Sequence, residues 1–188
     1  MRLATRGLWV AFGGAICLAG VARSGETPKA SDNAELRRMY VEDQDDRKPG
    51  LHGIDWSVVG PRDLARLKRA KELYQAGSLR TGADWLQAAL ILQHSSESDD
   101  YLLAHEMCVA ALANGEQGAK WLSAATEDRF LRSIGRKQRF GTQYEAAAEP
   151  GMFRLADTDA QVTDELRAAV GAPSLAEAAA TADRFDKK

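Results

Sequence analysis

The sequence predicts a mainly α-helical domain, a compact multi-helix bundle with tetratricopeptide-like helix pairs and one short β-hairpin. Three observations predict this fold class. Helix-capping residues and stop glycines recur along the chain, only two short runs alternate as strands do, and one stretch has the small-residue spacing of a helical repeat. The 188 residues are 45% hydrophobic and 28% charged, which is typical of a soluble globular protein with its own core.

The N-terminal segment is predicted to be a secretory signal peptide over residues 1–22. Arg2 and Arg6 supply a basic start, residues 7–21 carry no charge, and small residues precede an expected cleavage after Ala22. The apolar run is shorter than the roughly 20 residues that cross a bilayer, so cleavage is favoured over retention as an anchor. The mature protein is therefore expected to be extracytoplasmic, periplasmic or secreted, with no stable membrane insertion.

The first two helices of the domain are set by prolines and a glycine. A helix over residues 31–47 ends before Pro49, and a second over residues 61–76 begins with Pro61 at its first position. Gly77 ends this second helix, because glycine adopts the left-handed conformation that closes a helix.

Three further helices make up the centre of the chain. Thr81 and Asp84 have the spacing of a capping pair and open a helix over residues 81–94. The next two helices are predicted over residues 98–114 and 116–134, each followed by a glycine.

The C-terminal part contains the only strand-like pattern and two more helices. Residues 139–144 and 152–155 alternate apolar and polar side chains and are joined through a turn at 149–151, which predicts a hairpin. A helix is expected over residues 163–170, and the capping box begun by Ser174 opens the last one. The predicted organisation is a signal peptide (1–22), a polar lead (23–30), a single domain (31–183) and a frayed tail (184–188).

The net charge limits the expected partners, and the cysteine count limits the expected disulfides. The formal net charge of −2 offers no basic face for nucleic acid, so the expected partner is a small polar ligand or another protein. Cys108 is the only cysteine left after removal of the signal peptide, so no intramolecular disulfide is expected. We expect Cys108 to be a buried core residue.

Residues 104–125 have the small-residue spacing of one tetratricopeptide-type or Sel1-type unit. A solenoid needs about three such units, and no second copy follows at the roughly 34-residue period. A helical protein-interaction module without catalysis is therefore kept as the alternative function.

Charged and amide side chains fall among the apolar residues of four predicted helices when successive residues are turned by about 100°. These inward polar residues are Asp43, Gln44, Arg47, Gln93, His94, His105, Asp128 and Arg129. Val109 and Trp121 lie in the same apolar stripes and are expected in the core. An unpaired buried charge costs several kcal/mol, so the inward charges must pair, face a wet cleft or contact a ligand.

Two interpretations of these inward residues stay open. One is a polar pocket framed by the helices over 31–47, 81–94, 98–114 and 116–134, with the hairpin as its rim. The other is an internal salt-bridge network that locks the first of these helices to the last. A single inward residue such as His105 or Gln93, taken alone, is more typical of a satisfied core residue.

The order of several short motifs resembles a bacterial family of uncharacterised domains with the pattern DQxxR, QH, DR, GTQ and TDxxR. The matching segments are DQDDR (43–47), QHS (93–95), DR (128–129), Gln138, FGTQ (140–143) and TDELR (163–167). The resemblance covers about residues 40–180 and implies a single domain that includes the hairpin and the last helices. It carries no assigned activity, and it adds Gln138 and Gln143 to the candidate site.

Several known chemistries are excluded by the motifs. His105 and Glu106 begin like a zinc-protease helix, but Val109 stands where the second histidine should be. The sequence has no Gly-rich phosphate loop and no G-x-S-x-G elbow, and we expect no metal and no cofactor. A two-histidine, one-carboxylate metal site from His94, His105 and Asp128 is the alternative that helix spacing leaves open.

The function predicted from the sequence is a pocket for a small polar or anionic ligand, with hydrolysis as an additional hypothesis. In that hypothesis a histidine acts as general base, oriented by a carboxylate, while an arginine holds an anionic group. The catalytic candidates are His94, His105 and Asp128. The ligand-binding candidates are Asp43, Gln44, Arg47, Gln93, Arg129, Gln138 and Gln143.

Overall fold

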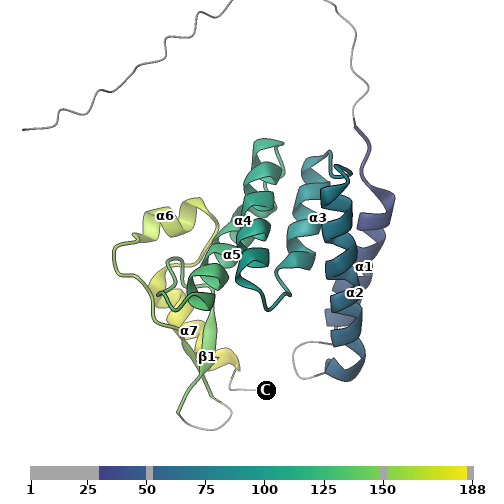
Figure 1. Ribbon diagram of the computed structural model, residues 1–188. Coiled ribbons are helices and arrows are strands. Elements are labelled where there is room, and N and C mark those ends of the chain that lie inside the picture. The colour runs from purple at the N-terminus through teal and green to yellow at the C-terminus, as the bar shows by residue number, and fades with distance from the viewer. Residues whose placement is uncertain (1–29, 50–52, 149–151, 186–188) are drawn as a thin grey trace, which may run out of the picture.

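The computed structural model describes residues 30–49, 53–148 and 152–185. These residues form seven helices and one two-stranded antiparallel sheet, which confirms the mainly α-helical class with a short hairpin (Figure 1). The helices are α1 (Ala34–Arg47), α2 (Trp56–Gln75), α3 (Gly82–Leu92), α4 (Ser98–Ala113), α5 (Ala119–Ser133), α6 (Asp164–Ala169) and α7 (Leu175–Phe185). The strands are β1 (Tyr144–Ala146) and β2 (Phe153–Leu155). The expected signal peptide and the 149–151 turn lie outside the described residues.

Side-chain caps set most helix starts as the sequence predicts. Thr81 and Asp84 form the full capping box at the start of α3, with each side chain accepting from the other residue's backbone N–H. The Thr163 hydroxyl accepts from Leu166 N at the start of α6. Ser174 and Glu177 form the second capping box, at the start of α7.

The start of α2 differs from the prediction. The helix begins at Trp56, and Pro61 lies inside it rather than at its first position. The reason is Asp55, whose carboxylate accepts hydrogen bonds from the backbone N–H and the hydroxyl of Ser57 and so caps the helix earlier. The missing N–H of Pro61 removes one bond in the second turn, which this cap helps to offset.

The first strand is also shorter than predicted. Residues 139–143 form a loop in place of a strand, and β1 covers only Tyr144–Ala146, paired antiparallel with β2 from Tyr144↔Leu155 to Ala146↔Phe153. Gly141 has φ +76°, which breaks the extended conformation. The N–H groups of this loop bond to a side chain of α5 instead of to a neighbouring strand, as described below.

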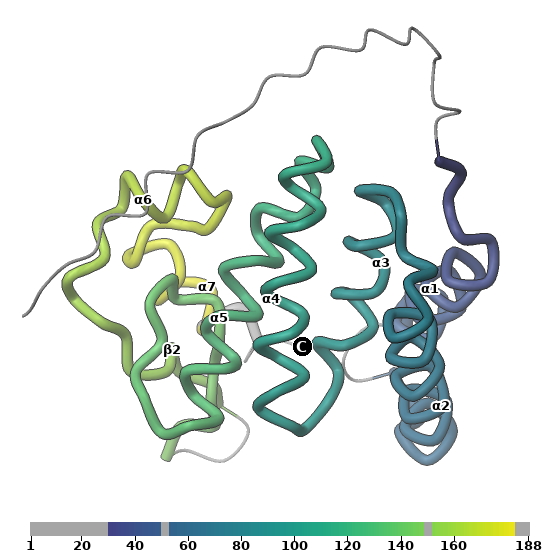
Figure 2. The backbone as a smooth tube through the Cα atoms, turned by 45° about the horizontal axis from the view of Figure 1, so that its top comes forward, coloured from purple at the N-terminus to yellow at the C-terminus, as the bar shows by residue number. Residues whose placement is uncertain are grey.

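Helices α1 and α2 lie at one side of the molecule, α3, α4 and α5 follow in turn, and α6, α7 and the sheet lie at the other side (Figures 1 and 2). The larger core lies among α1, α2, α3, α4 and the start of α5, and its fully buried members include Leu36, Leu92 and Cys108. A second, smaller core of Ala124, Phe140, Val162 and Ala172 lies where α5 meets the C-terminal elements. Helix α5 therefore contributes to both cores and carries the connection between the two halves of the domain.

Burial of the apolar stripes is only partly as predicted. Cys108 is buried, as expected, and burial raises the pKa of its thiol to about 12, although a hydrogen bond from Thr126 acts in the opposite direction. Val109 and Trp121 are 52% and 45% exposed, so their assignment to the core is wrong. Val109 follows the buried residue Cys108, and Trp121 precedes the buried residue Leu122. Adjacent helical residues are rotated by about 100°, so Val109 and Trp121 point outward.

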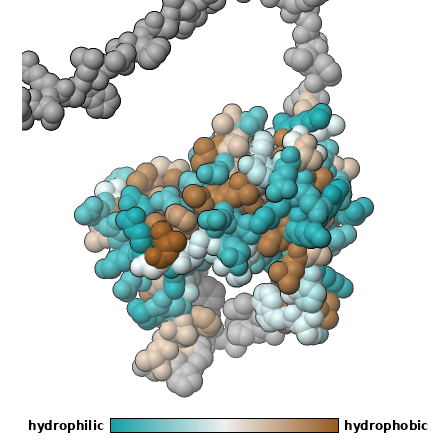
Figure 3. All heavy atoms as spheres, viewed as in Figure 1, coloured by the Kyte–Doolittle hydropathy of each residue, from teal (hydrophilic) through white to brown (hydrophobic). Residues whose placement is uncertain are grey.

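The face of the molecule seen in Figure 3 is mostly polar. Hydrophilic groups cover much of the face seen in Figure 3, with hydrophobic residues scattered among them. Within the described part of the chain, none of the helices combines the length and the apolar character needed to cross a membrane.

Candidate functional site

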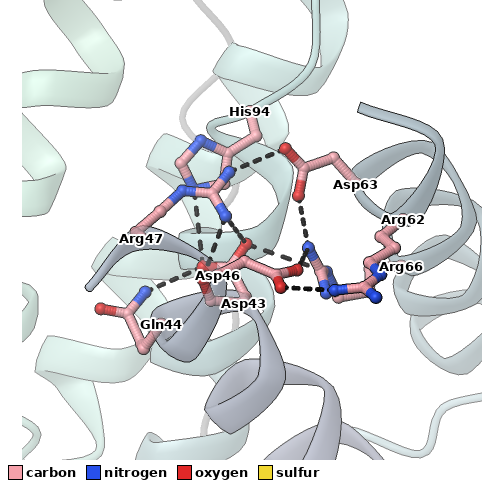
Figure 4. A network of polar contacts seen from close by, with 8 residues as sticks. All are labelled: Asp43, Gln44, Asp46, Arg47, Arg62, Asp63, Arg66 and His94. Carbon is pink, nitrogen blue, oxygen red and sulfur yellow. Dashed lines mark hydrogen bonds and ion pairs between the residues drawn. The ribbon is translucent and has the colours of Figure 1, made fainter. Parts of the chain in front are cut away.

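The structure places most of the predicted polar residues in two groups and a structured loop, with His105 outside them. We define the α1–α2 network as Asp43, Gln44, Asp46, Arg47, Arg62, Asp63, Arg66 and His94 (Figure 4). We define the Arg129 pocket as a hollow of about 380 Å³ lined by Ser96, Tyr101, Arg129, Arg132, Ser133, Gln143 and Tyr144. No ion pair between described residues joins the first group to the second.

Asp43 and Arg47 lie at the centre of the α1–α2 network. Asp43 is only 1% exposed, and its Oδ1 lies 2.8 Å from Nη1 of Arg47, one helical turn further along α1. Arg47 then reaches α2, where its Nη2 donates to Oδ2 of Asp63 over 2.8 Å. The inward direction predicted for Asp43 and Arg47 is therefore observed, and their partner is on α2.

Arg66 is the second bridge between α1 and α2. It is 5% exposed, and its Nη2 lies 2.8 Å from Oδ2 of Asp46 and 2.6 Å from Oδ1 of Asp63. Arg62 donates to the other oxygen of Asp46 over 2.8 Å. Three guanidinium groups thus alternate with three carboxylates, counting Asp43 and Arg47, and the network is balanced in charge.

The pKa values agree with this balance. Burial alone would raise the pKa of Asp63, but hydrogen bonds from Arg66 and Arg47 hold it below the usual value. The pKa of Asp46 is lowered in the same way, against desolvation, by hydrogen bonds from Arg66 and Arg62. Both carboxyl groups are therefore ionised at neutral pH and stabilised by their partners.

His94 and Gln44 complete the network around Asp43. Gln44 Nε2 donates to Oδ2 of Asp43 over 2.8 Å. His94 Nε2 lies 3.6 Å from the same oxygen, which is too long for a hydrogen bond, and this buried nitrogen has no hydrogen-bond partner within 30–49, 53–148 and 152–185. His94 follows α3 directly after the buried residue Gln93, so the network also connects the end of α3 to α1.

The α2 members of the network were not found from the sequence. The structural interpretation of the inward charges joined the helix over 31–47 to that over 116–134, whereas the observed partners of α1 are on α2. A signal was present, because Arg66 follows Val59 by seven residues and precedes Ala70 by four, and all three share one buried face.

Asp128 positions the loop over residues 139–143. It is fully buried and accepts hydrogen bonds from the backbone N–H groups of Arg139, Phe140 and Thr142, at 2.6–3.0 Å from the nearer oxygen. The Thr142 hydroxyl donates to it as well, over 2.8 Å. Both carboxylate oxygens are occupied by this loop, so Asp128 acts as an architectural anchor and its oxygens do not face a substrate.

Gln138 and Arg167 fix the same loop from its two ends. Gln138 is fully buried, donates to the carbonyl oxygens of Gln143 and Ala156, and accepts from Gln143 N. Arg167 is also fully buried, and its Nη1 donates to the carbonyl of Arg139 over 2.6 Å. The DR, GTQ and TDELR segments of the motif pattern therefore meet at one loop.

The three catalytic candidates lie in different surroundings. His105 on α4 is half-buried, and its Nδ1 lies 2.9 Å from the carbonyl oxygen of Ser123 on α5. His94 lies in the α1–α2 network and Asp128 beneath the loop, and among the described residues no hydrogen bond or ion pair joins any two of the three. Among the described residues, no three His, Cys, Asp or Glu side chains are grouped closely enough to hold a metal ion.

Arg129 follows Asp128 on α5 but faces the Arg129 pocket. Its guanidinium forms no ion pair with any carboxylate of the described residues, and its Nε is buried without a hydrogen-bond partner. Burial lowers the pKa of this guanidinium, and the neighbouring Tyr101 hydroxyl offsets only part of the effect. The pocket therefore holds a cation that the surrounding protein does not neutralise.

The other lining residues of the pocket supply polar groups from several elements. Gln143, from the loop held by Asp128, donates to the Thr142 hydroxyl over 2.9 Å. Arg132 Nη2 donates to Glu145 over 2.8 Å, while its Nη1 is buried without a partner. Tyr101 and the other lining residues outside the DR and GTQ segments were not singled out from the sequence, because the pocket forms only when α4, α5 and the hairpin pack together.

Comparison with known proteins adds no assignment of function. No family model, curated protein or solved structure matches this chain. The resemblance to an uncharacterised domain family stays a prediction. Function is therefore inferred from the geometry of the α1–α2 network and the Arg129 pocket.

Proposed function

We propose that this domain binds a small anionic ligand, bearing a carboxylate or phosphate group, in the Arg129 pocket. The observation that supports this most strongly is Arg129 itself. It is a half-buried guanidinium without a carboxylate partner among the described residues, and it lines a hollow of about 380 Å³. A guanidinium presents its N–H donors in a flat fork that matches the oxygens of a carboxylate or phosphate.

Electrostatics favour an anion over a cation in this pocket. Its seven lining residues include two arginines and no aspartate or glutamate. Removal of a cation from water is costly unless an opposite charge replaces the lost hydration, and an incoming anion supplies that charge. Binding thus relieves an unfavourable feature of the empty domain.

The neutral lining residues suit a polar ligand. Tyr101, Gln143, Ser96 and Ser133 surround Arg129 with hydroxyl and amide groups, and these groups already donate within the protein, as Tyr101 does to the carbonyl of Ser95. Among the described residues, the buried unpartnered donors left for an anion in this pocket are Nε of Arg129 and Nη1 of Arg132. Gln143 belongs to the loop that Asp128, Gln138 and Arg167 hold in place, so its position is fixed before binding. In this proposal the buried motif residues preorganise the pocket and do not contact the ligand.

Hydrolysis forms no part of the proposal. Asp128 is saturated by the loop, so it cannot orient a histidine base in the way the sequence hypothesis requires. We propose that the ligand is met outside the cytoplasm, because residues 1–22 are predicted from the sequence to be an export signal. The interaction-module alternative predicts that small anions do not bind, and the experiment below separates the two.

Isothermal titration calorimetry with inorganic phosphate and with citrate tests the proposal. We expect the wild-type domain to bind at least one of these anions and Arg129→Gln to bind it about tenfold to a hundredfold more weakly, as the loss of a hydrogen bond to a charged group predicts. Arg37→Gln, which removes an exposed arginine on α1, is the matched control and should leave affinity unchanged. Equal binding by wild type and Arg129→Gln, or no binding by the wild type, would overturn the proposal.

A further inference from the structure

We infer that the ligand carries two anionic groups, the second held in a basic hollow that adjoins the Arg129 pocket. This inference rests on the proposed function. The second hollow has a volume of about 230 Å³. Its charged lining residues are Arg132, Arg136, Lys137, Glu145, Arg154 and Asp157. We call it the basic hollow.

The basic hollow has an excess of positive charge. Its two carboxylates face four cations, and Glu145 is shared between Arg132 and Arg154. Asp157 lies 3.6 Å from Arg154 as well, so the two carboxylates pair with Arg132 and Arg154. Arg136 and Lys137 form no ion pair with a carboxylate in the described part of the chain, and their charge is free to meet a ligand.

Arg132 connects the two hollows, because it lines both of them. Its Nη2 is held by Glu145, which fixes the guanidinium between the hollows, while its buried Nη1 has no hydrogen-bond partner. A ligand with one anionic group at Arg129 therefore has Arg132 as its next neighbour and the uncompensated charge of Arg136 and Lys137 beyond it.

The size and the charge of this surface identify the class of ligand. The two hollows, of about 380 and 230 Å³, together are of the size that a small molecule occupies. The chain has a net negative charge overall, which disfavours a long polyanion. The ligand that fits is a small molecule with two phosphate, phosphonate or carboxylate groups on one scaffold. Linking two groups raises affinity only when the linker matches the distance between their binding sites.

A series of α,ω-alkane bisphosphonates with linkers of increasing length tests this inference. All members carry the same two anionic groups, so affinity reports the fit of the spacing. By calorimetry we expect one linker length to bind the wild type about tenfold or more tightly than the corresponding alkyl monophosphonate. The double variant Arg136→Gln/Lys137→Gln should lose this gain and keep the affinity for the monophosphonate.

Arg37→Gln/Lys120→Gln is the matched control, because it removes two exposed cations from α1 and α5 that line neither hollow. It should keep the gain. If the wild type binds the monophosphonate but no bisphosphonate more tightly, or if Arg136→Gln/Lys137→Gln retains the gain, this inference is overturned and the proposed function stands. If the wild type binds neither class of phosphonate, the proposed function fails and this inference fails with it.

Discussion

The α1–α2 network and the Arg129 pocket begin from the same sequence feature, charged residues on the apolar faces of helices, and differ in charge balance. In the network, three guanidinium groups meet three carboxylates at distances of about 2.6–2.8 Å for their closest contacts. In the pocket, Arg129 forms no ion pair with a carboxylate of the described residues. The comparison teaches that the inward direction of a charged side chain does not by itself decide its role. A charge paired with opposite charges in the protein is architectural, and an unpaired one is available to bind a ligand.

This difference has a thermodynamic consequence. A residue in a compensated network leaves an unpaired buried charge behind when it is removed, and the folded state loses stability. Removal of an uncompensated cation leaves no orphaned partner. The variants that follow are ordered by the size of the effect that this reasoning predicts.

The largest effect is expected from Arg66→Met in the α1–α2 network. This variant leaves Asp46 and Asp63 without their shared partner and should lower the free energy of unfolding by about 3–5 kcal/mol. Urea denaturation measures the change. Arg38→Met removes one member of an exposed pair with Glu42 and should cost no more than about 1 kcal/mol. If Arg66→Met lost as little stability as Arg38→Met, the α1–α2 network would not be the structural element that we describe.

A smaller loss is expected from Asp128→Asn, which tests the anchor of the loop that shapes the pocket. The amide keeps the size of the side chain but turns one acceptor into a donor that faces backbone N–H groups. We expect a loss of about 2–3 kcal/mol in chemical denaturation, since hydrogen bonds to a charged group are the ones lost. Glu127→Gln, next to it on α5 and paired with Arg139 at 3.4 Å on a more exposed face, should change stability by less than about 1 kcal/mol. Equal losses would show that Asp128 does not anchor the loop.

The α1–α2 network should contribute to the pH dependence of stability. Asp63 has a pKa lowered from its usual value of 3.8 in the folded state, so its contribution is complete above that value and is lost as the pH falls through the lower folded pKa. The difference in unfolding free energy between wild type and Asp63→Asn should therefore shrink as the solution is acidified from pH 5 or so downward. A difference that stays constant, or grows, in acid would contradict the lowered pKa.

Local parts of the fold could be predicted from the sequence because their causes are local. The capping box of Thr81 and Asp84 needs only a spacing of three residues, and the burial of Asp43 and Asp128 follows from helical periodicity. The alternation of residues 139–144 predicts a strand, and the prediction is wrong over 139–143 because the N–H groups of this loop bond to Asp128, a partner more than ten residues away. That contact depends on how α5 packs against the hairpin.

The pairing of charges could not be predicted, because it depends on which helices are neighbours. Arg47 could equally pair with a helix that follows α3, and only the packing of α2 against α1 gives it Asp63. The same holds for Arg129, whose lack of a carboxylate partner among the residues that the structure describes is a property of the assembled pocket. Periodicity identified the inward residues, and tertiary packing decided their roles.

The most direct test of the account is the free energy of unfolding of Arg129→Met, measured by urea denaturation in the absence of added anions. Because Arg129 has no carboxylate partner in the part of the chain that the structure describes and is costly to bury, we expect this variant to be as stable as the wild type or more stable by about 1 kcal/mol. A loss comparable to that of Arg66→Met would contradict the account, since it would mean that the Arg129 charge is part of the scaffold.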